Sequence, residues 1–185
     1  MQQPIILASQ SPRRTHLLHM IGLAHEVIPA NINEVMNPKE EPEAFAARMS
    51  LEKAQAVSAL HPGRTIIAAD SVVVAATAQV FGKPKDKRDA LHMLQTLAGQ
   101  RHIVHTGVTV IINEETKTEV VTTYVWFRAM SEKEIDTYIE REKPYDKAGA
   151  YGIQGPAAVF VKKIEGDYYN VMGLPLCTLH EMLQS

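Results

Sequence analysis

Residues 65–75 read TIIAADSVVVA, an apolar run rich in β-branched residues that is interrupted only by Asp70 and Ser71. Such a run predicts a buried strand. A carboxylate in the middle of a buried strand costs several kcal/mol unless it is paired, hydrogen-bonded, bound to a metal or placed at the mouth of a cleft. We therefore interpret Asp70 as the leading catalytic candidate, and a bulge or a buried ion pair is the structural alternative.

Strands and helices alternate on both sides of this run. We expect further strands at 4–8, 26–29, 79–81, 103–113, 118–130 and 158–164, and helices at 11–21, 43–60, 87–98, 131–142 and after Pro175. A polar loop at 114–117 joins the two longest strands, and a glycine-rich loop spans 143–156. Because the elements interleave without a repeat or a linker, the sequence predicts an α/β fold with a mixed twisted sheet and flanking helices. We expect one domain over residues 1–185, with two lobes around a cleft as the alternative.

The composition argues against several classes of protein. The chain has 185 residues, with 19 Lys and Arg against 21 Asp and Glu, a net charge of -2 and 6% aromatic residues. A surface for nucleic acid or anionic lipid needs a basic excess, and single strands need stacking platforms. The single cysteine, Cys177, rules out a disulfide scaffold. Without a signal peptide or a run of about 18 apolar residues, we expect a cytoplasmic protein with no membrane span.

Three cationic side chains occupy positions that favour a nearby anion. Residues 9–14, SQSPRR, form a polar loop and the start of a helix, where free N–H groups and the helix dipole attract anions. Arg13 and Arg14 oppose that dipole unless an anion is close, and ordinary surface arginines are the alternative. Lys53 interrupts an apolar stripe formed by residues 46, 49, 57 and 60, so it must either snorkel outward or meet an anion.

Two loops add further candidates. Residues 82–86, GKPKD, resemble a phosphate clamp in chemistry because two lysines precede a helix, although an ordinary basic loop fits equally well. Residues 146–155, DKAGAYGIQG, contain three glycines and present Gln154, whose amide can read the donor and acceptor pattern of a base edge. A plain surface loop is the alternative. The histidine pairs 16/19 and 102/105 lack a Cys or carboxylate at metal-ligand spacing, and we interpret them as structural.

Taken together, the motifs resemble a known family. In chain order they are LASQSPRR at 7–14, EKA at 52–54, ADSVV at 69–73, GKP at 82–84, TGV at 106–108, DKAGAYGIQG at 146–155 and GLP at 173–175. Each motif alone is weak to moderate, but the set spans nearly the whole chain and resembles the Maf family of nucleoside triphosphate pyrophosphatases. The resemblance implies the fold of inosine triphosphate pyrophosphatases (Maf/Ham1) with a central cleft. It also implies hydrolysis of a nucleoside triphosphate to the monophosphate and pyrophosphate with a divalent cation, Mg²⁺, Mn²⁺ or Co²⁺.

Three positions are similar to the branch of this family that cleaves dTTP and UTP. That branch carries arginine after the Ser-Pro pair, a small hydroxyl residue after the aspartate and glutamine in the glycine-rich loop, which are matched here by Arg13, Ser71 and Gln154. The 7-methyl-GTP branch has Trp, Gln and Glu at these positions. Ser71 departs from the threonine that the resemblance predicts, so a methyl group that could pack against the base is missing while the hydroxyl is kept.

The resemblance implies a role for each matched residue. Asp70 would accept a proton from the attacking water, and Glu34 with Asp70 would bind the metal. An ordinary surface glutamate is the alternative for Glu34. Gln154 and Ser71 would hydrogen-bond to a uracil or thymine edge. The substrate-binding residues around the triphosphate would be Ser9, Arg13, Arg14, Lys53 and Lys83.

The implied biology is housekeeping of the nucleotide pool, which limits misincorporation of modified nucleotides, by a homodimer, the usual state of relatives. Two alternatives stay open. The chain could be a pyrophosphatase for other modified nucleotides, or a non-enzymatic regulator of cell division, because the family was named for an effect on septum formation. Metal-dependent release of pyrophosphate from UTP distinguishes an enzyme from a regulator.

Overall fold

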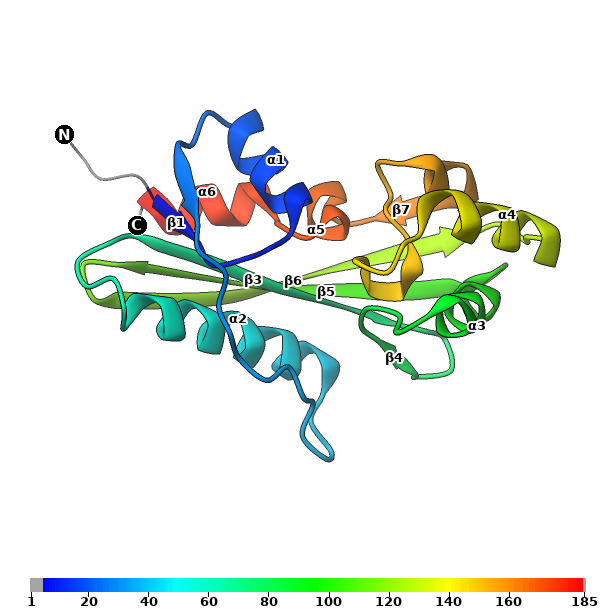
Figure 1. Ribbon diagram of the computed structural model, residues 1–185, viewed down its shortest axis with the longest axis horizontal. Coiled ribbons are helices and arrows are strands. Elements are labelled where there is room, and N and C mark those ends of the chain that lie inside the picture. The colour runs from blue at the N-terminus through cyan, green and yellow to red at the C-terminus, as the bar shows by residue number, and fades with distance from the viewer. Residues whose placement is uncertain (1–4, 185) are drawn as a thin grey trace. The chain divides into compact units, whose positions relative to one another are not determined.

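Seven strands form one open sheet in the part of the chain that the structure describes, residues 5–184 (Figure 1). In this computed structural model the strands are β1 Ile5–Leu7, β2 His25–Val27, β3 Ile66–Val74, β4 Val80–Phe81, β5 Arg101–Ile112, β6 Glu115–Phe127 and β7 Val161–Glu165. The strand order is β2-β1-β3-β5-β6-β7, and β4 pairs with β3. β1 pairs in parallel with β2 and β3, whereas the β3–β4 and β6–β7 pairs are antiparallel. The sheet is therefore mixed, as the sequence predicts.

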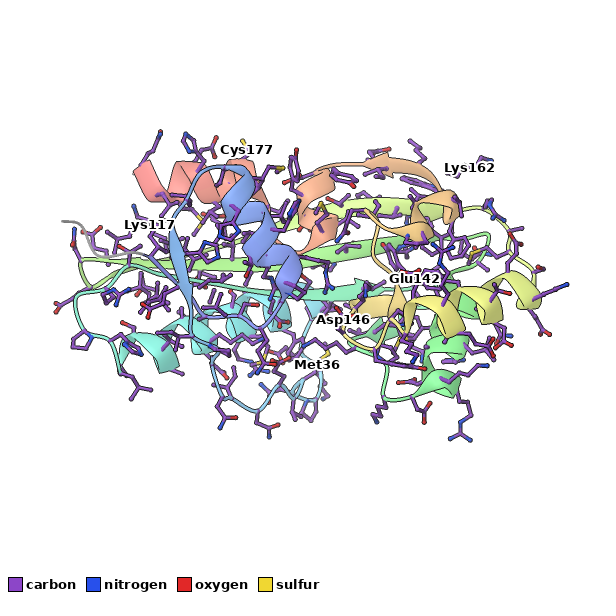
Figure 2. All side chains as sticks on the ribbon, turned by 45° about the horizontal axis from the view of Figure 1, so that its top comes forward. Met36, Lys117, Glu142, Asp146, Lys162 and Cys177 are labelled. Carbon is purple, nitrogen blue, oxygen red and sulfur yellow. The ribbon has the colours of Figure 1, made fainter. Side chains whose placement is uncertain are left out.

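Helices connect most of these strands. They are α1 Pro12–Met20, α2 Pro42–Ser58, α3 Lys87–Leu97, α4 Glu132–Glu142, the short 3₁₀ helices η1 Ala148–Ala150 and η2 Pro156–Phe160, α5 Tyr168–Met172 and α6 Leu176–Gln184. The predicted α/β fold with flanking helices is confirmed, and the central cleft stays a prediction. Cys177 is exposed on α6 (Figure 2). Among residues 5–184, no helix combines the length and the apolar character needed to cross a membrane.

The chain forms two compact units, and three strands run from one unit into the other. The first unit consists of the described residues up to Asp70, of Thr106–Val121 and of the described residues from Gly173 onward. The second consists of Ser71–His105 and Thr122–Met172. β3, β5 and β6 therefore each contribute to both units. The single domain over residues 1–185 stays a prediction.

In the first unit, helices cover both faces of the sheet, with α2 on one face and α1 and α6 on the other (Figure 1). Side chains alternate along a strand. Ile66 and Ala68 of β3 therefore share the face that packs against Ala54 and Val57 of α2. The expectation that Leu60 extends the apolar stripe of this helix is wrong, because α2 ends before it and Leu60 is 75% exposed.

Helix α2 approaches β5 closely at Gly107. A Cβ atom at this position would overlap the carbonyl oxygen of Ala46 in α2. Farther along the same helix, the hydroxyl groups of Ser50 and Thr109 share a buried hydrogen bond of 2.8 Å. Glycine thus lets the helix backbone lie directly against the strand, and this contact helps to fix the part of α2 that follows, including Lys53.

A cluster of buried rings lies in the second unit. The ring centroids of His102, Phe127 and Tyr151 are 4.8–5.4 Å apart. The Nε2 atom of His102 lies 2.8 Å from the Tyr151 hydroxyl. Burial lowers the pKa of His102 to about 3, and burial also raises the pKa of Tyr151. Both side chains are therefore neutral in the folded protein at neutral pH.

The predicted starts of two helices are confirmed. In α4, the Glu134 N–H donates to Ser131 Oγ and the Ser131 N–H donates to the Glu134 carboxylate, which completes the capping box that this spacing predicts. Helix α1 begins with Pro12 at its first position. Gly22 follows its end with a φ of 73°, a conformation that glycine adopts readily.

Two predictions for the second half of the chain are wrong, and one helix there was not predicted. The expected loop at 114–117 is a turn of two residues, Asn113 and Glu114, with φ values of 49° and 71°. Two positive φ values in a row are typical of the type I′ turn, whose twist matches that of a hairpin. The strand expected at 158–164 begins only at Val161 because η2 precedes it. Helix α5 was not expected, and the Asp167 carboxylate accepts the Tyr169 N–H at its start.

Candidate active site

The alternation of side chains along β3 places Asp70 on the face that α2 covers. Ile66 and Ala68 point to α2 from this face, and Asp70 is the next residue in the same register. Asp70 is only 8% exposed. A carboxylate in this position needs a partner of opposite charge or a set of hydrogen-bond donors.

Lys53 of α2 is that partner. Its neighbours along the helix face, Met49 and Val57, are buried, and Lys53 itself is 7% exposed. The Lys53 Nζ atom lies 2.5 Å from Asp70 Oδ1 and 2.8 Å from Glu34 Oε1. Lys53 therefore meets anions instead of snorkelling, and the buried ion pair that the sequence left open as an alternative for Asp70 is present.

Glu34 reaches Lys53 from the loop that links β2 to α2, in which Figure 2 labels Met36. The Glu34 side chain is 44% exposed, in contrast to Asp70. One ammonium group thus serves two carboxylates, and the cluster of three side chains opens to solvent at Glu34.

Arg14 and Ser9 form a second polar group in the first unit. Arg14 is 8% exposed, and its guanidinium donates from Nε to the Gly173 carbonyl at 2.7 Å and from Nη1 to Ser9 Oγ at 2.9 Å. Ser9 Oγ also accepts the Ser11 N–H at 3.2 Å. These bonds fix the loop between β1 and α1 and hold Arg14 in one orientation at the first turn of the helix.

The electrostatic surroundings of Arg14 connect it to the Lys53 cluster. Burial lowers the pKa of Arg14 to about 10, the carboxylates of Asp70 and Glu34 oppose this shift, and Arg13 adds to it. Arg14 therefore keeps its charge at neutral pH. The first turn of α1 also holds Arg13 and contains no acidic residue. This combination of arginines and a helix N-terminus favours an anion.

Ser71, Lys83 and Gln154 belong to the second unit. Ser71 follows Asp70 on β3 and is partly buried, whereas Lys83 and Gln154 are exposed. The Gly149 N–H donates to the Gly82 carbonyl at 3.1 Å, so the loop with Lys83 lies beside the glycine-rich loop. Gly149 has a φ of 66°, and a Cβ atom there would lie 3.0 Å from the Val73 side chain. The close approach of this loop to β3 therefore requires glycine.

The structure thus brings together part of the predicted site. In the first unit, Ser9 contacts Arg14, and Lys53 contacts both Glu34 and Asp70. Arg14 lies close enough to Asp70, Glu34 and Arg13 for their charges to affect its pKa. The loops of Lys83 and Gln154 are neighbours in the second unit. A shared substrate for the two groups stays a prediction.

The carboxylates of the Lys53 cluster suit a divalent cation that the substrate helps to hold. Within residues 5–184, no three His, Cys, Asp or Glu side chains are grouped so that they could hold a metal ion. Glu34 and Asp70 supply oxygen donors within 2.8 Å of one Lys53 atom. Mg²⁺ is commonly bound by one or two carboxylates together with substrate phosphates and water. Two carboxylates are therefore suited to an open site, in which substrate phosphates and water complete the coordination of Mg²⁺ or a similar ion. They are not suited to a closed site made of protein ligands alone.

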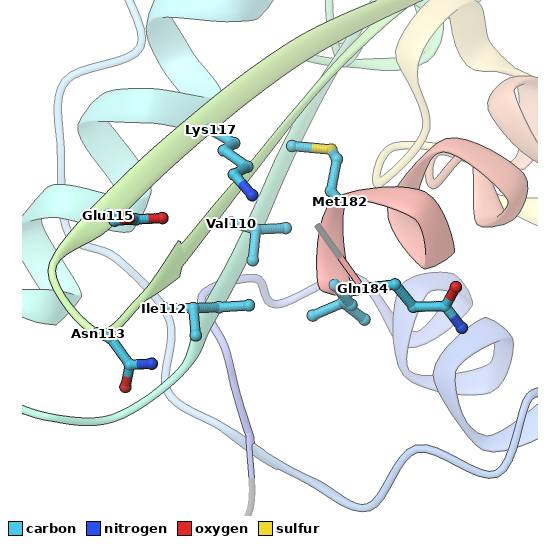
Figure 3. Close-up of a pocket in the computed structure, with 8 residues that line it drawn as sticks. Val110, Ile112, Asn113, Glu115, Lys117, Met182 and Gln184 are labelled. Atoms are coloured by element: carbon cyan, nitrogen blue, oxygen red, sulfur yellow. The ribbon is translucent and has the colours of Figure 1, made fainter.

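A separate pocket of about 210 Å³ lies in the first unit, near the end of α6 (Figure 3). Val110 and Ile112 of β5, Lys117 of β6 and Met182 of α6 line it. It contains none of the predicted site residues. We therefore assign the candidate active site to the Lys53 cluster and not to this pocket.

Two side chains near the cluster escaped the sequence analysis. Arg48 of α2 and Glu40 of the preceding loop form an ion pair with two N–O distances of 2.7 Å. Both occupy positions where polar residues are ordinary, and eight residues separate them. The only local signal is Glu52, four residues after Arg48, which also pairs with it at 3.0 Å.

Comparisons with known proteins identify the family of this chain. The family model described as Maf-like protein matches residues 4–185. A dTTP/UTP pyrophosphatase of Desulfotalea psychrophila is 48% identical, covering 98% of this chain and 93% of that protein. Proteins of the same name from Lacticaseibacillus casei, at 46% with 97% of each chain, and Syntrophus aciditrophicus, at 43% with 98% and 89%, also match. A solved Ham1 protein of Staphylococcus aureus aligns with 68% of this chain and 72% of its own at 18% identity and a TM-score of 0.44. The protein belongs to the Maf family.

Proposed function

We propose that this chain is a nucleoside triphosphate pyrophosphatase that hydrolyses dTTP and UTP to the monophosphate and pyrophosphate. The observation that carries the proposal is Lys53, buried between the carboxylates of Asp70 and Glu34 with Arg14 nearby. Groups of this kind can bind phosphate oxygens and activate water. The names of the three relatives, dTTP/UTP pyrophosphatase, support the same reaction.

The cationic side chains bind the triphosphate in this proposal. Arg14 is held rigidly by Ser9 and the Gly173 carbonyl, so it loses little freedom when a phosphate binds. Arg13 sits beside it in the same helical turn. Lys53 and Lys83 contribute further positive charge. Together these cationic side chains orient the α–β anhydride bond for attack.

Asp70 acts as the general base. A water molecule adds to a phosphorus atom of the α–β anhydride bond, its proton passes to the Asp70 carboxylate, and the bond to the bridging oxygen breaks to release pyrophosphate. Lys53 holds Asp70 through their ion pair on the α2 side of β3. Glu34 and Asp70 would hold the divalent cation, Mg²⁺, Mn²⁺ or Co²⁺, which would neutralise phosphate charge.

Gln154 and Ser71 select the base. The Gln154 amide offers a donor and an acceptor to the uracil or thymine edge, and a base with the wrong pattern leaves these groups unpaired. Ser71 supplies its hydroxyl from β3. Lacking the threonine methyl, Ser71 packs less tightly against the base, so we expect weaker discrimination than in a threonine-containing relative.

The decisive experiment follows pyrophosphate release from UTP, dTTP, CTP, ATP and GTP with Mg²⁺. We expect UTP and dTTP to have the highest kcat/KM, chelation to abolish the reaction, and Asp70→Asn to lower kcat by at least about 100-fold. Asp136→Asn, which breaks an exposed lysine–aspartate pair of 2.9 Å, serves as the matched control and leaves kcat unchanged.

Each contrary outcome contradicts a different part of the proposal. Turnover of Asp70→Asn within a few-fold of the original chain contradicts the role of Asp70 as base. Preference for a purine nucleotide contradicts the pyrimidine assignment and leaves the reaction class intact. If none of these five nucleotides releases pyrophosphate, the dTTP/UTP proposal is wrong, and the alternatives of a pyrophosphatase for modified nucleotides and of a regulator gain.

The homodimer and the cytoplasmic location are part of the same proposal. The homodimer rests on the resemblance to the Maf family, and the cytoplasmic location rests on the expectation from the sequence. Sedimentation equilibrium of the purified chain tests the dimer directly, and a mass equal to one chain at micromolar concentration contradicts it.

A further inference from the structure

The position of Glu34 depends on the loop that carries it. This loop, residues 28–41, joins β2 to α2 outside any helix or strand of the described chain. Glu34 meets Lys53 at 2.8 Å although its side chain is 44% exposed. A half-exposed carboxylate on a loop keeps such a position for more of the time when neighbouring residues of the loop are anchored.

Arg48 anchors the loop at two points from the side of α2. Its Nε and Nη2 atoms donate to both carboxylate oxygens of Glu40 at 2.7 Å, and Nη2 also donates to the Val35 carbonyl at 3.0 Å. Val35 directly follows Glu34, and Glu40 lies just before the helix. One guanidinium therefore ties both ends of residues 35–40 to the helix.

Glu40 closes this segment on itself. Its carboxylate accepts the Asn37 N–H at 2.8 Å, and its own N–H donates to the Asn37 carbonyl at 3.1 Å. The Glu40 side chain is 11% exposed, and the Arg48 guanidinium lies 5.5 Å from the centroid of the Phe45 ring. Bidentate arginine–carboxylate pairs of this kind have fixed geometry, which a lysine cannot reproduce.

We propose that Arg48 and Glu40 are positioning residues that hold Glu34 beside Lys53 and Asp70, and that this anchoring sets the affinity of the site for its divalent cation. The inference rests on the proposed function, because Glu34 acts there as a metal ligand. Arg48 and Lys53 lie five residues apart on one helix, so α2 carries both the anchor and the cation that Glu34 meets.

The anchor differs from the Lys53–Asp70 pair in what its loss should do. Breaking it frees the loop while leaving Asp70 and Lys53 in contact on β3 and α2. The metal then loses one of its two carboxylates for part of the time, and the general base remains. We therefore expect a loss of metal affinity with little change in kcat at saturating metal.

The test compares Arg48→Met and Glu40→Gln with Arg64→Met and Glu26→Gln. The control pair resembles the anchor because it joins an arginine, with a side chain 16% exposed, to a glutamate at 3.0 Å elsewhere in the first unit. Three quantities are measured: amide hydrogen exchange of residues 34–40 in the metal-free protein, Mn²⁺ affinity by titration calorimetry in the presence of a non-hydrolysable UTP analogue, and pyrophosphate release as a function of Mg²⁺ concentration.

We expect both anchor variants to exchange the Asn37 amide at least about 10-fold faster, because its acceptor is removed or released. Mn²⁺ affinity falls by about 10- to 100-fold, the usual effect of losing a group that orients a metal ligand. kcat at saturating Mg²⁺ stays within about threefold, and the control variants keep the original exchange and affinity.

The outcomes separate the inference from the function on which it rests. If the unaltered chain binds Mn²⁺ and the anchor variants bind it equally well, the inference is overturned and the proposed function stands. If the unaltered chain binds no Mn²⁺, the metal role of Glu34 is wrong and the inference falls with it. If Arg48→Met fails to fold, Glu40→Gln, which keeps the size of the side chain, decides the question.

Discussion

At the scale of single residues, Lys53 is a charged side chain whose burial costs free energy. Its ammonium group is removed from water, and two carboxylates compensate for that loss. A buried pair contributes little compared with apolar packing, but removing one partner leaves an uncompensated charge. The cluster is therefore better explained by chemistry that needs the charges than by stability.

Replacing Lys53 by methionine tests this reasoning. We expect Lys53→Met to lower the free energy of unfolding by about 3 kcal/mol, because Asp70 stays buried without its ion-pair partner. The double variant Lys53→Met/Asp70→Asn should recover most of that loss. Urea unfolding at pH 7 measures both effects.

The matched control is Lys87→Met. The Lys87 Nζ atom also meets two carboxylates, Asp136 and Glu140, at 2.9 Å each, but its side chain is 47% exposed. Exposed pairs contribute about 1 kcal/mol or less. Equal losses for Lys53→Met and Lys87→Met would mean that burial of Lys53 carries no special cost.

The sequence predicted Lys53 and Asp70 because each breaks an apolar pattern, and such a break has few structural explanations. It also indicated Arg14, which opposes the helix dipole at its position. Arg48 and Glu40 could not be found in this way. They are polar residues at polar positions, and their pairing depends on how a loop folds back on a helix.

At the scale of elements, the contact between α2 and β5 decides where Lys53 lies. Gly107 permits the contact because a side chain there would overlap the Ala46 carbonyl. The motif TGV at 106–108 drew attention to this glycine through the family resemblance alone. Its physical reason, a helix backbone lying on the strand, depends on tertiary packing that no local pattern encodes.

Gly107→Ala should therefore displace α2 and the Lys53 cluster together. We expect the free energy of unfolding to fall by about 1–3 kcal/mol, as is typical of overpacking. We also expect a lower kcat per folded molecule. Urea unfolding and pyrophosphate release measure the two effects. The stability control is Gly82→Ala, where a new Cβ atom meets nothing within 4 Å. Unchanged stability of Gly107→Ala would contradict the close approach.

Element boundaries followed the sequence well where a cap or proline marks them, as at Pro12 and Ser131. They failed where backbone geometry overrides residue preference. Glu114 adopts a positive φ that is unusual for glutamate, so the hairpin turn is shorter than its polar residues suggested. Residues 156–160 are apolar enough for a strand, yet Pro156 starts a 3₁₀ helix.

At the scale of the whole molecule, the division into two compact units leaves no trace in the sequence. The chain passes between the units four times, within β3, β5 and β6 and at the end of α5 between Met172 and Gly173. The passage within β3 falls between Asp70 and Ser71. Composition was equally uninformative about the site. A net charge of -2 conceals the arginines and lysine that gather near Asp70.

The pH dependence of global stability tests the buried ring cluster of the second unit. His102 has a pKa of about 3 when folded because burial disfavours its charged form, whereas an unfolded histidine titrates near 6.5. Between these values the unfolded state binds the extra proton, so the free energy of unfolding decreases as the pH falls through this window. From pH 7 to pH 5 we expect a loss of about 2 kcal/mol from this residue. Urea unfolding of His102→Gln at both pH values should lack that loss, whereas His16→Gln on the exposed side of α1 should retain it. An equal pH dependence in His102→Gln and the unaltered chain would show that another group, and not His102, makes the fold sensitive to mild acid.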